Sequence, residues 1–213
     1  MTVETMNVHQ ALVELKTLDK RIGAAIRDPK WVVPNKHSNK MIGGVEVEVW
    51  VADVLAKYQK VTDLIKRRDA IKRAVVNSNA VTRVMVAGKG YTVAEAIDRK
   101  NHGVEFLKLL AQKIVRDYTE ANATAEKANG TDLELRADNH VKNVVGNSDV
   151  KGATAEILKV RRDFVVAQTM ELVDPIGALK VVEKLDEEVT SFLMDVDAVL
   201  STSNATTQIT VEY

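Results

Sequence analysis

A glycine–lysine–glycine loop, Gly88–Gly90, is the first stretch of this sequence whose residue types and spacing could bind a phosphate group. It follows a β-branched run and precedes Thr92, where a helical pattern begins, which is also the order of a phosphate-binding loop. A Walker A loop requires G-x-x-x-x-G-K-[ST], but Arg83 stands five before Gly88 and Gly90 replaces the Ser or Thr. We therefore predict a tight turn in which Gly88 and Gly90 supply positive φ, with incidental anion attraction at the Thr92 helix start.

The histidines give no metal or catalytic pattern. None of His9, His37, His102 and His140 pairs with another at i, i+4, and no H-E-x-x-H motif is present. The chain has no cysteine and no G-x-S-x-G motif, which excludes a thiol nucleophile and the hydrolase elbow. Its 30 Asp and Glu residues fall mainly on polar helix faces, and nothing selects a catalytic pair. We predict no catalytic residue, no cofactor and no metal ligand, and hence no enzyme.

The composition argues against nucleic acids and membranes as binding partners of this chain. The formal net charge is zero and the most basic segment, Lys66–Arg73, is interrupted by Asp69, so we expect no nucleic-acid partner. No run approaches 18 apolar residues and the N-terminus has no signal-peptide pattern, so we expect synthesis in the cytoplasm and no membrane span. With 46% hydrophobic and 4% aromatic residues, the 213-residue chain favours long packed helices.

Heptad patterns define the first half of the chain. Residues 5–28 carry two seven-residue rows offset by three, listed as Val8, Leu15, Ile22 and Ala11, Leu18, Ala25, which predict a helix packed lengthwise on a partner. Residues 29–44 form a long loop around Trp31. Residues 46–78 predict a second helix, although the alternation in "VEVEVW" also suits a short strand.

The middle of the chain mixes short strands with helices. Residues 82–86 predict a strand, and a capping box of Thr92 and Glu95 begins a helix predicted to reach about residue 128. A polar segment follows, with helices expected at 133–145 and 153–166. Residues 169–173 predict another short strand.

The last helix has the clearest periodicity. We expect Asp174 to cap it, Pro175 to begin it, and residue 200 to end it. Its two heptad rows are Val182, Val189, Val196 and Ala178, Leu185, Phe192, Val199. Residues 201–207 are predicted as a linker, and "QITVEY" at 208–213 as an edge strand.

Together these patterns predict a mainly α fold: an elongated bundle of long antiparallel coiled-coil-like helices, with a small sheet at helix ends and a C-terminal edge strand. We interpret residues 1–213 as one elongated helical domain. Within it, residues 129–152 form a polar segment that can be an insertion, and residues 204–213 form a strand arm.

The segments "ALVELKTLDKRI", "LIKRRDAIKRAV", "GKGYTVAEAIDRK" and "DPIGALKVVEKLDEEVTSFLMDVDAVLSTSNATTQI" resemble, in this order, the septicolysin-like family of small helical bacterial and phage proteins. The sequence departs from that pattern at residues 29–44 and 131–152. The resemblance implies a helical, oligomeric, non-enzymatic protein, and the family name adds a pore-forming or cytolytic alternative.

We therefore hypothesise a non-catalytic structural protein that forms a homo-oligomer with itself and contacts other structural proteins. The most concrete setting is a phage or phage-like virion, as a neck, tail or capsid-associated subunit. The alternatives are the cytolytic protein and an enzyme whose site lacks a motif. We expect the C-terminal strand to be held by a neighbour's sheet. The candidate interface residues are Trp31, Val182, Leu185, Val189, Phe192, Val196, Ile209, Val211 and Tyr213.

Overall fold

The computed structural model describes residues 2–146 and 154–213. The chain is 73% helical and has small antiparallel sheets of two strands each, which confirms the mainly α prediction. It divides into two compact units. Unit 1 comprises residues 1–103 and 191–213, and unit 2 comprises residues 104–190. The last helix crosses this division, with residues 178–190 in unit 2 and residues 191–206 in unit 1.

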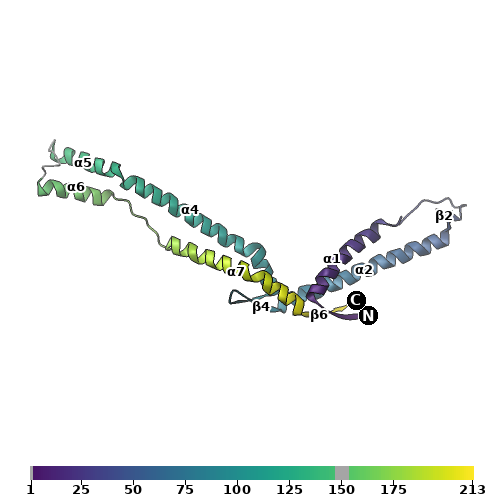
Figure 1. Ribbon diagram of the computed structural model, residues 1–213. Helices are drawn as coiled ribbons and strands as arrows, with labels where there is room; N and C mark the ends of the chain where they lie inside the picture. The colour runs from purple at the N-terminus through teal and green to yellow at the C-terminus, as the bar shows by residue number, and fades with distance from the viewer. Residues whose placement is uncertain (1, 147–153) are drawn as a thin grey trace. The chain divides into compact units, whose positions relative to one another are not determined.

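The framework of unit 1 is a pair of adjacent helices, α1 (Val8–Arg27) and α2 (Val47–Val81) (Figure 1). The first two members of each predicted heptad row of α1 are buried in a core shared with α2, while Ile22 and Ala25 are half-buried. This core consists of Met6, Val8, Ala11, Leu15, Leu18, Ala70, Ile71, Val75, Ile209 and Val211. The first helix begins at Val8 rather than Thr5, because the Asn7 side chain accepts the N–H of Gln10 at 2.7 Å in a capping box.

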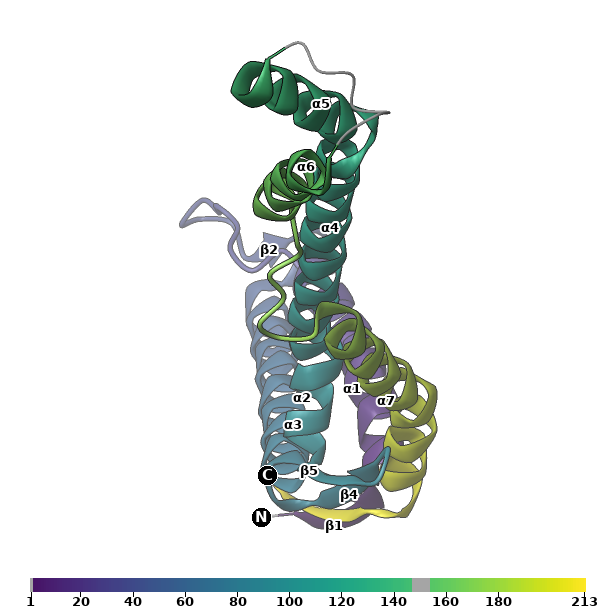
Figure 2. The same cartoon turned by 90° about the vertical axis from the view of Figure 1, so that its left-hand side faces the viewer.

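The two ends of the chain form one antiparallel sheet. Strand β1 (Val3–Asn7) pairs with β6 (Gln208–Glu212), from Val3 opposite Glu212 to Asn7 opposite Gln208. Figures 1 and 2 accordingly show the N- and C-termini side by side. The strand predicted at 208–213 is therefore present. However, the expectation that a neighbour's sheet holds it is wrong, because β1 of the same chain supplies its hydrogen bonds and Ile209 and Val211 are buried in the core of unit 1.

A half-buried arginine of α2 joins β1, α1 and the C-terminal Tyr213 beside this sheet. The Arg67 guanidinium in α2 forms ion pairs with Glu4 of β1 at 2.9 Å and with Glu14 of α1 at 2.5 Å. It also donates to the Tyr213 hydroxyl and lies 4.8 Å from the centre of that ring. The Glu14 hydrogen bond is the main cause that raises the pKa of Arg67. The basic segment at 66–73 is thus partly occupied by internal ion pairs.

At the other end of the α1–α2 pair, the loop contains a short hairpin of β2 (Met41–Ile42) and β3 (Val45–Glu46). Its turn residues Gly43 and Gly44 both have positive φ, as a two-residue hairpin turn requires. The alternation in "VEVEVW" therefore forms a strand only at its first two residues, and the helix begins at Val47.

The rest of unit 1 begins with a hairpin, β4 (Arg83–Val86) and β5 (Lys89–Thr92). The predicted turn is present, but its two positive-φ residues are Ala87 and Gly88, not Gly88 and Gly90. Helix α3 (Val93–Asp98) follows, with the predicted capping box of Thr92 and Glu95. A π-helical turn, η1 (Arg99–Gly103), separates it from the next helix, so the helix predicted at 93–128 is interrupted there.

The Thr92–Glu95 box should make the stability of unit 1 depend on pH. The Thr92 N–H donates to Glu95 Oε2 at 2.6 Å, and this bond, with a smaller effect of Arg83, lowers the Glu95 pKa below its ordinary 4.5. The folded-state pKa is below the unfolded one, so the ionised carboxylate stabilises the fold above pH 4.5 and this contribution disappears as pH falls through the folded-state value. We expect Glu95→Gln to lower the urea midpoint of unit 1 at neutral pH and to match wild type in acid.

The matched control is Glu183→Gln, which removes an exposed carboxylate of α7 that accepts no capping bond among the described residues. Its urea midpoint should follow wild type at both pH values. An equal loss in both variants at neutral pH would contradict the role assigned to the capping box.

The last helix, α7 (Ala178–Thr206), contributes its C-terminal half to unit 1. The Phe192 ring packs edge-on against Tyr91 of β5 at 5.8 Å, and the Asp195 carboxylate accepts the Ala87 N–H at 2.8 Å. The linker predicted at 201–207 is wrong, because the helix continues to Thr206. There the Thr206 hydroxyl donates to the Thr202 carbonyl at 3.0 Å, one turn earlier.

Unit 2 consists of α4 (Val104–Asn129), α5 (Thr131–Val145), α6 (Ala155–Gln168) and the first half of α7. Helices α5 and α6 pack on one another, as Figure 1 also shows. Arg161 of α6 pairs with Asp138 at 2.8 Å and with Glu134, and the Asp138 hydrogen bond is the main cause that raises the Arg161 pKa. The helices predicted at 133–145 and 153–166 are present with these shifted bounds. The predicted start at Ala153 and residues 147–152 of the polar segment lie outside the described residues.

Candidate functional site

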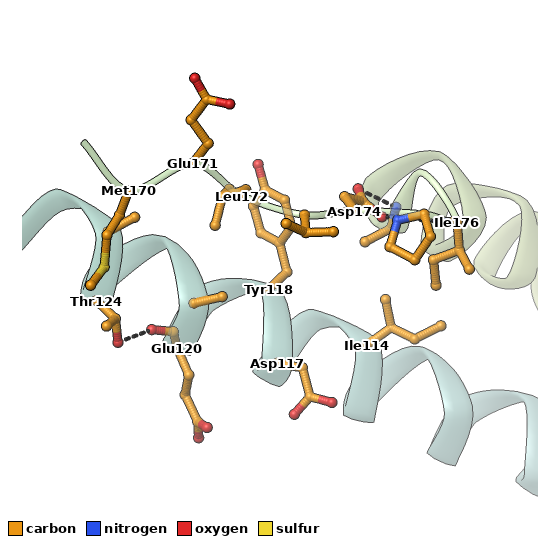
Figure 3. A pocket seen from close by; sticks show the side chains of 15 residues that line it. Ile114, Asp117, Tyr118, Glu120, Thr124, Met170, Glu171, Leu172, Asp174 and Ile176 are labelled. Carbon is orange, nitrogen blue, oxygen red and sulfur yellow. Dashed lines mark hydrogen bonds between the residues drawn. The ribbon is translucent and has the colours of Figure 1, made fainter. Parts of the chain in front are cut away.

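A groove of 720 Å³ lies in unit 2 between α4 and the segment 169–177, which joins α6 to α7 (Figure 3). Its lining is mainly apolar and includes small residues of α4. The lining residues are Ile114, Asp117, Tyr118, Glu120, Ala121, Thr124, Ala125, Met170, Glu171, Leu172, Val173, Asp174, Pro175, Ile176 and Ala178. An open apolar groove of this size is a candidate binding site.

One wall of the groove is a chain segment with no strand partner among the described residues. The strand predicted at 169–173 is therefore wrong as a paired strand. Instead, the side-chain amide of Asn129 binds the backbone of Met170 twice: its Oδ1 accepts the N–H at 2.8 Å and its Nδ2 donates to the carbonyl at 2.7 Å. One side chain thus supplies the two bonds that a neighbouring strand would otherwise make at this residue.

The other end of the segment is fixed by Asp174. Its carboxylate accepts the N–H of Ala178 at 2.7 Å and of Ile176 at 3.3 Å. The predicted capping role of Asp174 is therefore present, but the helix begins at Ala178 rather than Pro175. Gly177, with φ of 67°, lies in the left-handed region and delays the helix start.

Side chains between these two fixed points alternate in direction. In Figure 3 Met170 and Leu172 point toward α4, whereas Glu171 points away from it. Val173 follows with 93% of its surface exposed, and Ile176 is also exposed. The segment therefore presents apolar side chains to the groove and to solvent.

The charged residues that line the groove are all acidic. They are Asp117, Glu120, Glu171 and Asp174, and the lining includes no Lys, Arg or His. Asp117 and Glu120 pair with Lys113 and Arg116 one helical turn away, at exposed positions where such pairs are weak. In the part of the chain that the structure describes, no ion pair involves Glu171. The groove thus has an apolar floor and an acidic rim.

The glycine–lysine–glycine turn offers no phosphate site in this arrangement. The Ala87 N–H of the turn donates to the Asp195 carboxylate, and the Thr92 N–H donates to Glu95. Two carboxylates of the chain itself therefore occupy backbone donors that a phosphate would need. The sequence predicted incidental attraction of an anion at the Thr92 helix start, and the Glu95 carboxylate of the chain itself occupies the Thr92 N–H there.

The histidines lie apart from one another in sequence and setting. His9, His37 and His102 are exposed, while His140 stacks on the Phe164 ring at 4.5 Å between α5 and α6. Within residues 2–146 and 154–213, no cluster of three or more His, Asp or Glu side chains could hold a metal ion. None of the helices described there is long and apolar enough to cross a bilayer.

The predicted interface residues fall into several environments. Trp31 is half-buried, donates its Nε1–H to the Ile26 carbonyl at 3.0 Å and packs edge-on against Tyr58. Val189, Phe192 and Val196 are buried within the chain, as are Ile209 and Val211. Half-buried positions are Val182, Leu185 and Tyr213. The structure therefore assigns most of these side chains to internal packing.

Sequence reasoning missed the groove. The alternation of "TMELV" was visible and led to a strand prediction, but its proximity to α4 depends on residues about 50 positions apart. The role of Asn129 also had no sequence signal, because a side chain that replaces a strand partner leaves no local sequence pattern.

In comparisons with known proteins, no family model, curated protein or solved structure matches this chain. The resemblance to the septicolysin-like family therefore stays a prediction from its motifs.

Proposed function

We propose that this chain is a non-catalytic structural protein that assembles with copies of itself and with other structural proteins. One observation carries the proposal. In the part of the chain that the structure describes, 30 large apolar side chains are exposed, whereas 23 apolar residues are buried. Scattered apolar residues are normal on protein surfaces, but clustered ones mark sites of protein–protein contact.

One such cluster lies on α4. Phe106, Leu109 and Leu110 occur at i, i+3 and i+4, so they are neighbours on the helix surface, and all three are exposed. We call these three residues the α4 stripe. A second copy of the chain that covers it would remove a phenylalanine and two leucines from water, each worth about 1.5–3 kcal/mol.

The setting that we propose for this assembly is a phage or phage-like virion, as a neck, tail or capsid-associated subunit. The apolar rows of α1 and α7 pack mainly within the chain, so the exposed α4 stripe is the surface that supports contact between subunits. The cytolytic alternative rests on the resemblance alone, and no feature of the described residues favours it.

The mass of the purified protein in solution, measured by light scattering after size exclusion, tests this proposal. We expect a multiple of 23.5 kDa at micromolar concentration. Phe106→Glu should move the mass toward 23.5 kDa, because a charge within the stripe opposes its burial. Phe106 is 71% exposed, so the substitution should leave the fold of the subunit intact.

Val166→Glu is the matched control, since Val166 of α6 is also 71% exposed but lies outside the α4 stripe. Its mass should equal that of wild type. A wild-type protein that stays at 23.5 kDa at every concentration would overturn self-association, and an equal loss of mass in both variants would overturn the role of the stripe.

A further inference from the structure

The wall of the groove has the properties of a strand that lacks a partner. Residues 171–173 are extended, and the structure gives their backbone N–H groups no hydrogen bond within the described residues. Asn129 and Asp174 hold the two flanking positions in place. Because the segment is already fixed, a partner that pairs with it need not supply the free energy of ordering it.

The floor of the groove could accept the side chains of an added strand. Ala121, Thr124 and Ala125 of α4 are small side chains that line the groove. The Tyr118 ring extends from α4 toward the segment (Figure 3). Side chains of a strand alternate between its two faces. A strand beside residues 171–173 would therefore direct every second side chain onto this apolar floor and the others toward the rim.

The rim defines the charge of the occupant. Asp117 and Glu120 already pair with lysine and arginine of α4, and Asp174 accepts the N–H groups at the start of α7. Glu171 has no ion pair among the described residues and points away from α4 (Figure 3), so it favours Lys or Arg at the neighbouring position that faces away from the floor. A second copy of this chain fits this requirement poorly, because its terminal strands β1 and β6 carry Glu4 and Glu212. Strand β4 carries Arg83 but is already paired with β5.

From this geometry we infer that the groove binds an extended segment of a different protein, in which apolar residues alternate with Lys or Arg, and that this segment pairs as a strand with residues 171–173. No residue of the α4 stripe lines the groove, although Leu110 and Ile114 are neighbours on α4, and peptide binding is measured separately from the mass of the protein.

The test uses the full chain and a fluorescein-labelled peptide, Lys-Val-Lys-Val-Lys-Val-Lys, with fluorescence anisotropy as the readout. We expect saturable binding at concentrations below about 1 mM, and no binding of the peptide in which Glu replaces Lys. Glu171→Lys should weaken binding about tenfold, because a like charge then faces the peptide. Glu156→Lys, at an exposed position of α6 outside the groove, should bind as wild type does.

Two further probes distinguish strand pairing from simple charge attraction. Peptides N-methylated at every Val or at every Lys each lose the N–H groups of one strand edge. Only one of the two should fail to bind, because a strand pairs through one edge. Hydrogen exchange followed by mass spectrometry should also show slower exchange at residues 169–174 when the peptide is bound.

Four results would overturn the inference: no binding of the basic peptide, equal binding of the acidic peptide, equal binding by Glu171→Lys, or equal binding of the two N-methylated peptides. Concentration-dependent protection of residues 169–174 in the protein alone would also overturn it, since a second copy would then fill the groove. None of these results alters the mass measured for Phe106→Glu, so failure of the strand site and failure of self-association can be told apart.

Discussion

Replacement of Phe192 by alanine should lower the free energy of unfolding of unit 1 by about 3–5 kcal/mol. Phe192 is 2% exposed and meets the Tyr91 ring edge-on, with an angle of 75° between the ring planes. The Arg99 guanidinium also lies 5.3 Å from the centre of the Phe192 ring. Removal of the ring therefore leaves a cavity and eliminates an aromatic and a cation–π contact at once.

Urea unfolding followed by circular dichroism measures this effect, and hydrogen exchange locates it. Exchange should become faster in β5 and η1 while the α5–α6 pair keeps its protection. Met194→Ala is the control because it shortens a side chain of the same helix that is 80% exposed and lies outside the α4 stripe, with an expected change within about 0.5 kcal/mol. Comparable losses in the two variants would show that Phe192 does not pack as described.

The second large effect is expected at Ile71, in the C-terminal third of α2. Its side chain is fully buried at 0% exposure, in the cluster that joins α1, α2 and the β1–β6 sheet. Ile71→Ala should destabilise unit 1 by about 2–5 kcal/mol, and Ile71→Val by about 0.5–1.5 kcal/mol, because the second variant leaves a smaller cavity. Chemical denaturation of both variants gives the two values.

Ile65→Ala provides the control on the same helix. Ile65 is 37% exposed, against 0% for Ile71, so its truncation removes less buried surface, and alanine is the better helix former. Its stability should equal or slightly exceed that of wild type. The described core of unit 1 would be refuted if Ile71→Ala were no more harmful than Ile65→Ala.

Much of the fold follows from patterns within a few residues of one another. The rows at Val8, Leu15 and Ala11, Leu18 predict the buried face of α1, because a seven-residue repeat returns to one side of a helix. The Thr92–Glu95 box predicts the start of α3 for an equally local reason: both partners lie within one turn. The hairpin turn at residues 87–88 belongs to the same class, although Ala87 rather than Gly90 takes positive φ.

Helix ends were predicted less well, because capping side chains and strand partners compete with the helix for the backbone groups at its ends. The helix predicted from residue 5 begins only at Val8. Residues 5–7 belong to β1, because Asn7 caps the helix and β6 offers hydrogen bonds. Residues 201–206 are polar like a linker, yet Ser and Thr hydroxyls can bond to the preceding helical turn, and α7 continues through them.

By itself the sequence determined that this protein is mainly α-helical, where most helices run, and that no recognised catalytic motif is present. Only the tertiary structure decided that β6 pairs with β1 of its own chain, and that the α1 seam is closed by α2. It also decided that Asn129 and Asp174 hold an unpaired segment beside α4. The physical reason is the sequence separation of the interacting residues. Periodicity and capping act between residues about one helical turn apart. The tertiary contacts join residues far apart in the chain, and they depend on which partner lies close enough in space to hydrogen-bond the backbone N–H and C=O groups.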